Sequence, residues 1–194
     1  MERAILYVNA CVRKESRTRK LAEELLAKLD QPFEEVRLEE ITFPTSNEEY
    51  LNLREQLLSR GEYQNALFDL ARQFSKAETI VIAAPYWDLS FPAMLKQYLE
   101  QITVVGITFR YSEEGIPIGL CKAKQIYYVA TAGGFYVPED YGFGYVKALA
   151  QNYFGIPDVR KIEADGLDIR GADVDAILAS AVEKIRAKNW ETES

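Results

Sequence analysis

Five short runs of apolar residues recur along the chain, and each is separated from the next by segments with a different spacing. The runs are rich in branched and aromatic side chains, which favours buried β-strands. They occupy Arg3–Asn9, Phe33–Leu38, Thr79–Ala84, Gln125–Thr131 and Val159–Ala164. Phe33–Leu38 is the weakest of these runs, because its apolar residues alternate with charged ones.

The segments between the runs carry apolar residues at helical spacing. In Ser16–Leu29, for example, Leu21, Leu25 and Leu29 share one face of a helix. The expected helices are Ser16–Leu29, 46–59 (opened by a capping box), about Glu62–Ser75, Pro92 to about Ile102, Tyr141–Phe154 and Asp173–Lys188. Strands that alternate with helices predict an α/β fold, a three-layer sandwich whose five parallel strands take the order 2-1-3-4-5.

All 194 residues, 1–194, are expected to form one domain, because no linker or internal repeat interrupts this alternation. Two connections are longer than the fold needs, about 40–63 and about 103–121, and we treat both as insertions. The second is expected to be irregular, since it contains three glycines and a proline.

Composition narrows the function. A net charge of −7 disfavours binding to nucleic acid or to an anionic membrane. The absence of histidine excludes His-based catalytic triads and zinc sites, and the two cysteines cannot make a Cys-only site, so we expect no metal. No apolar run is long enough to span a membrane, and no signal peptide is evident, so we expect a cytoplasmic protein. If the protein is an enzyme, the absence of histidine favours an organic cofactor as the source of its chemistry.

In an open parallel sheet, ligands bind beyond the carboxyl ends of the strands, and three loops there are unusual. The first, which contains Cys11–Thr18, leads into a helix N-terminus, where free N–H groups attract anions. Ser16 and Thr18 add hydroxyls and Arg17 adds positive charge, which favours a phosphate group. The glycine patterns of P-loop enzymes and of dinucleotide-binding dehydrogenases are absent from this loop.

The other two loops suit a flat ring. Tyr86 and Trp87 lie in the loop after the third strand and could form a wall of such a site. Gly133 and Gly134 follow the fourth strand and let the main chain approach a ligand closely. Each loop also has an ordinary structural explanation as a capped helix, packed aromatics or a turn, but their convergence at one edge favours a binding site.

The segment APYWDLSFPAMLKQYLEQITVVGITFRY, Ala84–Tyr111, carries a family resemblance. It resembles a loop, a Pro-x-x-Leu-Lys motif and a Gly-x-Thr-Phe-x-Tyr motif of the FMN-dependent NAD(P)H:quinone oxidoreductases and azoreductases, which have a flavodoxin-like fold. The likeness extends over nearly the whole chain. It implies an oxidoreductase that binds FMN and passes electrons from NADH or NADPH to quinones, azo or nitro compounds by a ping-pong mechanism. It further implies a homodimer, and chemistry at flavin N5 rather than at a catalytic side chain.

The resemblance also implies roles for individual residues. The cofactor-binding residues would be Cys11, Ser16, Arg17, Thr18, Pro85, Tyr86, Trp87, Asp88, Leu89, Thr131, Ala132, Gly133 and Gly134. Phe109 and Tyr111, carried by 103–119, would reach the partner's active site, and Tyr136 would bound the substrate pocket. Two positions depart from the family pattern. Cys11 stands where many members have serine, a better phosphate donor. Asp88 stands where some members have asparagine, and a carboxylate cannot donate a hydrogen bond to flavin O4.

Three alternatives remain open from the sequence. Cys11-x5-Arg17-Thr18 also fits the C-x5-R-[ST] pattern of low-molecular-weight cysteine phosphatases, in which Cys11 would be the thiolate nucleophile. Lys14 and Glu15 are unusual for that loop, which normally holds small residues. The other two alternatives are a flavodoxin-type electron carrier without turnover of its own, and a family member that has lost FMN.

Overall fold

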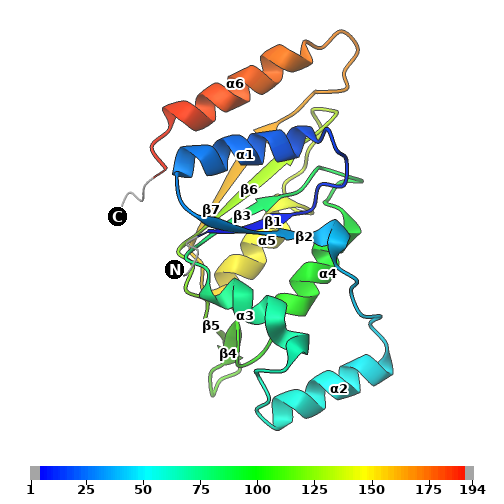
Figure 1. The fold of residues 1–194 in the computed structure, drawn as a ribbon, viewed down its shortest axis with the longest axis vertical. Helices are drawn as coiled ribbons and strands as arrows, with labels where there is room; N and C mark the ends of the chain where they lie inside the picture. The colour runs from blue at the N-terminus through cyan, green and yellow to red at the C-terminus, as the bar shows by residue number, and fades with distance from the viewer. Residues whose placement is uncertain (1–4, 191–194) are drawn as a thin grey trace.

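The computed structural model describes residues 5–190, and a five-stranded parallel sheet forms its centre (Figure 1). Its strands are β1 (Ile5–Asn9), β2 (Phe33–Arg37), β3 (Thr79–Ala83), β6 (Gln125–Thr131) and β7 (Asp158–Ala164). Their order across the sheet is β2-β1-β3-β6-β7, and every neighbouring pair is parallel. This confirms the predicted order 2-1-3-4-5. The first two residues of the strand predicted at Arg3–Asn9 lie outside the described residues.

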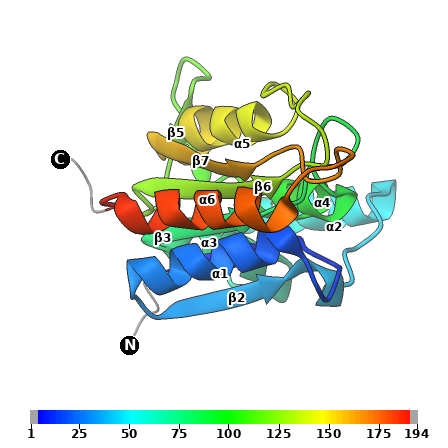
Figure 2. The same ribbon diagram turned by 90° about the horizontal axis from the view of Figure 1, so that it is seen from above.

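Helices cover both faces of the sheet, so that the fold is the predicted α/β sandwich of three layers (Figures 1 and 2). One face carries α1 (Arg17–Leu29) and α6 (Val174–Ala187), and the other carries α3 (Asp69–Lys76), α4 (Ala93–Ile102) and α5 (Phe143–Leu149). Three short helical segments complete these elements, η1 (Leu38–Glu40), η2 (Ala66–Phe68) and the π-helical η3 (Ala150–Phe154), which continues α5. No helix within residues 5–190 is long and apolar enough to cross a membrane.

The two cores lie on opposite faces of the sheet because strand side chains alternate. Leu6 and Val8 of β1 pack in the cluster shared with α3, α4 and α5. Ile5 and Tyr7 of the same strand pack in the cluster shared with α1 and α6. The inner strands β1, β3 and β6 are buried on both faces and apolar at nearly every position, which is the pattern that revealed them in the sequence, whereas the edge strands β2 and β7 also carry charged residues.

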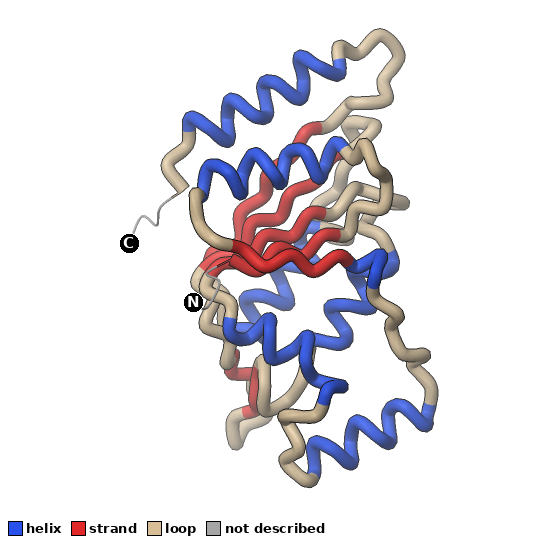
Figure 3. The backbone as a smooth tube through the Cα atoms, viewed as in Figure 1, coloured by secondary structure: helices blue, strands red, loops and turns tan. Residues whose placement is uncertain are grey.

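The first insertion, 40–63, contains α2 (Glu48–Ser59), which stands away from the sheet at the end of a long loop (Figures 1 and 3). The helix predicted from about Glu62 begins later than expected, at η2 and then α3. Asn65 sets that start, because its Oδ1 atom accepts a hydrogen bond from Leu67 N at 3.0 Å. An asparagine that caps the main chain in this way favours a helix that starts after it, so the residues before Asn65 stay outside the helix.

The second insertion is not irregular as predicted, because it contains a small antiparallel hairpin, β4 (Phe109–Tyr111) and β5 (Pro117–Gly119). A turn built on Ser112 closes it, with Ser112 N donating to Ile116 O at 2.8 Å. Strands of three residues are too short to show an alternating pattern, which is why the sequence did not reveal them.

Candidate functional site

A cavity of about 360 Å³ opens at the carboxyl edge of the sheet, where four strand-end loops meet. It is lined by Val12, Arg13, Glu15, Ser16, Arg17, Thr18, Pro85, Tyr86, Trp87, Thr131, Ala132, Gly133, Leu167 and Asp168. Its volume falls in the range of about 300–1,000 Å³ typical of small-molecule sites. The parallel register explains the convergence, since Asn9 lies beside Ala83 and Ala83 beside Val129, so these strands deliver their loops to one edge.

The cavity brings together most of the residues expected at the cofactor. These are Ser16, Arg17, Thr18, Pro85, Tyr86, Trp87, Thr131, Ala132 and Gly133. Four others, Cys11, Asp88, Leu89 and Gly134, belong to the same loops but do not line it.

The first loop offers an anion site at the start of α1. Ser16 is the N-cap residue, and its Oγ atom accepts from Arg19 N at 3.2 Å. The first turn of α1 contains no acidic residue, so the positive end of the helix dipole is not offset there. The Thr18 hydroxyl is buried and lies 2.6 Å from the Thr131 hydroxyl, which pins the helix start to the end of β6.

Polar contacts beneath the loop hold its main chain in place. Asn9 Oδ1 accepts from Cys11 N at 2.9 Å, and Arg19 Nη2 donates to Cys11 O at 2.6 Å. The Asn9 amide also donates to Glu35 on β2 at 2.8 Å. A loop fixed in this way presents its N–H groups to a ligand with little loss of conformational freedom on binding.

Cys11 is turned away from the cavity and only 1% exposed. Its Sγ atom lies 3.8 Å from Ala83 O, and burial raises the pKa of the thiol to about 11. A phosphatase nucleophile needs the opposite, a thiol whose pKa is lowered so that it ionises at neutral pH. The geometry therefore argues against the phosphatase alternative, although the sequence motif fits.

Alkylation of Cys11 in the folded protein tests this conclusion. With a pKa near 11, fewer than about one thiol in a thousand is ionised at pH 7.5, and thiolate accumulates only as the pH approaches 11. We expect iodoacetamide to leave Cys11 unmodified at pH 7.5, as read by peptide mass spectrometry, and Cys11→Ser to retain flavin binding. Labelling of native Cys11 at the rate of a free thiol would contradict the geometry.

The second loop makes a tight turn beside the cavity. Trp87 and Ser90 exchange main-chain hydrogen bonds of 3.0 and 2.8 Å, and the two residues between them have positive φ angles, 49° for Asp88 and 69° for Leu89. This is the left-handed geometry of a two-residue hairpin turn. Leucine there costs about 1–2 kcal/mol, and strain of this kind clusters at functional sites. The turn holds Tyr86 and Trp87 in the cavity wall and leaves Asp88 and Leu89 exposed at its tip.

The third loop is fastened to the loop after β7. The carbonyl groups of Ala132 and Gly133 accept from Leu167 N at 3.1 Å and Asp168 N at 2.9 Å. Every described peptide is trans, so the N–H groups that follow these carbonyls, those of Gly133 and Gly134, point away from that partner loop. A Cβ atom on Gly133 would lie 2.4 Å from Asp168 Oδ2, so a side chain at this position would displace the Asp168 carboxylate.

The loop after β7 was missed as part of the site. It contributes Leu167 and Asp168, and Asp168 Oδ1 lies 2.8 Å from Arg17 Nη1. The same carboxyl-edge rule that selected the loops after the first, third and fourth strands applies to the fifth, and would have found these residues. Val12, Arg13 and Glu15 of the first loop also line the cavity.

The three residues expected at the substrate pocket do not line the cavity. Phe109 is buried in the β4–β5 hairpin against Tyr153, with ring centroids 4.8 Å apart, and Tyr111 is 48% exposed. That hairpin lies at the other end of the sheet (Figure 1). Tyr136 is 79% exposed, and its carbonyl accepts from the Tyr86 hydroxyl at 3.4 Å.

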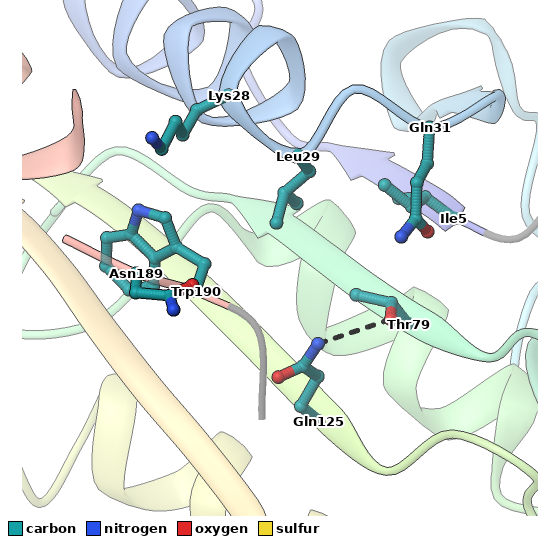
Figure 4. A pocket seen from close by; sticks show the side chains of 8 residues that line it. All are labelled: Ile5, Lys28, Leu29, Gln31, Thr79, Gln125, Asn189 and Trp190. Atoms are coloured by element: carbon teal, nitrogen blue, oxygen red, sulfur yellow. Dashed lines mark hydrogen bonds between the residues drawn. The ribbon is translucent and has the colours of Figure 1, made fainter. Parts of the chain in front are cut away.

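A second cavity, of about 490 Å³, lies at the opposite edge of the sheet (Figure 4). It is lined by Ile5, Lys28, Leu29, Gln31, Thr79, Gln125, Asn189 and Trp190. It is larger, but it meets the C-terminal end of α1, whose dipole disfavours an anion. It also has no glycine among its lining residues. No cluster of three or more His, Cys, Asp or Glu side chains within residues 5–190 could hold a metal ion.

This sheet order, with a helix N-terminus, an aromatic loop and a glycine loop at the carboxyl edge, defines the flavodoxin-like class. Residues 3–188 match the family described as having a flavodoxin-like fold. The chain is 37% identical to "FMN-dependent NADH:quinone oxidoreductase 2" of Clostridium acetobutylicum, over 96% of this chain and 98% of that protein. It is 44% identical to an "FMN-dependent NADH:quinone oxidoreductase" of Clostridium beijerinckii, over 62% of each chain.

Among solved structures, the fold matches that of an FMN-dependent NADH-azoreductase from Bacillus anthracis in complex with FMN. The TM-score is 0.78 at 23% identity, covering 94% of this chain and 95% of that one. The chain therefore belongs to the family of FMN-dependent NADH:quinone oxidoreductases, within the flavodoxin-like fold.

Proposed function

We propose that the protein is an FMN-dependent oxidoreductase that passes electrons from NADH to a quinone or an azo or nitro compound. The cavity at the carboxyl edge of the sheet is the observation that carries this proposal, since an anion site, an aromatic wall and a glycine loop meet there. The family supports the choice of cofactor, because the relatives are named for FMN and for NADH.

The residues of the cavity fit FMN chemically. The start of α1 and the Arg17 guanidinium suit the phosphate. The first turn of this helix contains no acidic residue, and its main-chain N–H groups add further donors. Tyr86 and Trp87 suit one side of the ring system, and Gly133 lines the cavity on the side proposed for its edge. Two residues expected to bind the cofactor, Cys11 and Asp88, do not line the cavity. Cys11 is buried, and Asp88 is exposed at the tip of its turn. We propose that Cys11 supports the loop rather than binding the phosphate.

When bound, FMN supplies the hydride and electron transfer that a protein side chain cannot. The protein binds and orients its reactants and stabilises negative charge. The N–H groups of Gly133 and Gly134 point away from the 167–168 loop, and we propose that they donate to the edge of the ring where negative charge develops. Trp87 and Tyr86 would cover one side of the ring, which leaves its other side to a flat acceptor.

We further propose a ping-pong mechanism, in which NADH and the acceptor use the same space at the cavity in turn. We expect parallel lines in double-reciprocal plots of NADH oxidation at several concentrations of a soluble benzoquinone. Intersecting lines would contradict a shared space, and flavin binding without turnover would favour the electron-carrier alternative.

We also propose that two copies form a homodimer around the site. Several large apolar side chains on the loops after β3 and β6 are exposed: Trp87, Leu89, Phe135, Tyr136 and Tyr141. Exposed aromatic clusters of this kind mark interaction surfaces. In a dimer, the exposed Tyr111 could approach the partner's cavity, which it does not reach in its own chain, whereas Phe109 is buried within the hairpin and would only support it. Sedimentation at twice the mass of one chain would support the dimer, and a monomer at micromolar concentration would contradict it.

We propose that the chain acts as one domain, residues 1–194, in the cytoplasm. Both cores are built from elements throughout residues 5–190, and Cys11 and Cys121 are free thiols, as expected in a reducing compartment. A single cooperative unfolding transition seen by both fluorescence and circular dichroism would support one domain.

A further inference from the structure

An ion pair at the candidate cofactor site joins the loop after β1 to the loop after β7. Arg17 is the first residue of α1, the helix that follows β1 in the chain, and Asp168 lies in the loop after β7. In the sheet, β3 and β6 lie between β1 and β7. Arg17 Nη1 lies 2.8 Å from Asp168 Oδ1 and 3.5 Å from Leu167 O. All three residues line the cavity, so the pair forms part of the wall of the space assigned to the ligand.

The surroundings hold the Asp168 carboxylate near this position. Asp168 N donates to Gly133 O at 2.9 Å, which fixes the main chain beside the glycine loop. Its Oδ2 atom occupies the space that a side chain on Gly133 would fill. The carboxylate therefore faces Arg17 through one oxygen and packs on Gly133 with the other.

A carboxylate and a phosphate present similar oxygen acceptors to a guanidinium group. Arg17 is the residue of the first loop that we assign to the phosphate, and its pairing with Asp168 uses one of its donors. A negative charge inside an anion site opposes a second anion, whereas the pair itself adds little stability because its side chains are 39% and 70% exposed.

We propose that Asp168 is a placeholder anion, which occupies Arg17 until the phosphate of the cofactor displaces it. The inference rests on the proposed FMN site. Asp168 is then a residue that limits cofactor affinity, not one that supports it, and binding of the phosphate separates the carboxylate from Arg17. Because the effect arises from charge, it applies to the phosphate and not to the flavin ring.

Affinity measurements on the variant Asp168→Asn test this role. The substitution removes the charge and keeps the size of the side chain. We expect the apoprotein variant to bind FMN about three- to fivefold more tightly than the wild type, measured by quenching of flavin fluorescence. Riboflavin, which lacks the phosphate, is expected to bind the two proteins equally. The gain for FMN is expected to shrink as the salt concentration rises, because salt screens exposed charges.

Two further variants complete the experiment. Glu183→Gln removes the same charge from an exposed position on α6 and is expected to leave FMN affinity unchanged. Asp168→Ser removes the charge together with side-chain volume and is expected to tighten FMN binding as Asp168→Asn does. Equal or weaker binding of FMN by both Asp168 variants would overturn the inference, and so would an equal gain for riboflavin. Failure of the wild type to bind either flavin would instead overturn the proposed cofactor site itself.

Discussion

Replacing Arg17 with alanine is expected to weaken FMN binding by about ten- to thirtyfold. A charge-assisted hydrogen bond to a phosphate contributes about 1.5–3 kcal/mol, and we take the lower part of that range because the Arg17 side chain is 39% exposed. Part of the gain in the wild type is also offset by the loss of the Asp168 pair. Fluorescence titration of the apoprotein with FMN measures the change directly.

The same variant separates binding from folding. The ion pair of Arg17 lies at the surface, so the free energy of unfolding is expected to fall by no more than about 1 kcal/mol. Riboflavin affinity is expected to stay unchanged. Lys28→Ala is the matched control, because it removes the same charge from an exposed position at the other end of α1. If both variants weaken FMN binding equally, the effect is one of net charge and Arg17 is not a specific phosphate ligand.

Replacing Gly119 with alanine is expected to cost about 3–4 kcal/mol of folding free energy. Its added Cβ atom would lie 2.2 Å from Gly155 N and 2.2 Å from Phe154 C, both main-chain atoms that cannot rotate away. The hairpin would therefore have to separate from the end of η3, where it packs. Thermal unfolding measures the loss, and each kcal/mol lowers Tm by about 2–4 °C in a protein of this size.

Gly115 provides the control within the same hairpin. Its φ is positive, 79°, unlike that of Gly119, and no atom lies within 4 Å of an added Cβ. Gly115→Ala is therefore expected to cost only about 1 kcal/mol, through backbone strain alone. Equal losses for the two variants would contradict the claim that close packing against Gly155 makes Gly119 necessary, because Gly119 has no positive φ to add strain of its own.

Sequence patterns predicted the sheet and its order because the relevant information is local. The inner strands β1, β3 and β6 are apolar on consecutive positions, and Ser16 followed by leucines at helical spacing marks the start of α1. The carboxyl-edge rule then placed three loops together without any structural information. The hairpin at Phe109–Gly119 escaped prediction because its strands have three residues each and depend on pairing.

Side-chain direction in the site was less accessible to prediction. Nothing local shows that the Cys11 thiol packs into the core while Ser16, five residues later, lines the cavity. The positive φ of Leu89 runs against the residue's own preference, so only the folded loop reveals it. The contact between Arg17 and Asp168 joins residues 151 positions apart in the chain and depends on how β7 is placed in the sheet.

An absorbance spectrum of the purified protein after reconstitution with FMN tests the central claim most directly. Once excess flavin has been removed by gel filtration, we predict a yellow protein that retains about one FMN per chain, with quenched flavin fluorescence. Its colour is expected to bleach when NADH is added without oxygen and to return on addition of a quinone. A colourless protein after the same treatment would contradict the assignment of the carboxyl-edge cavity as an FMN site.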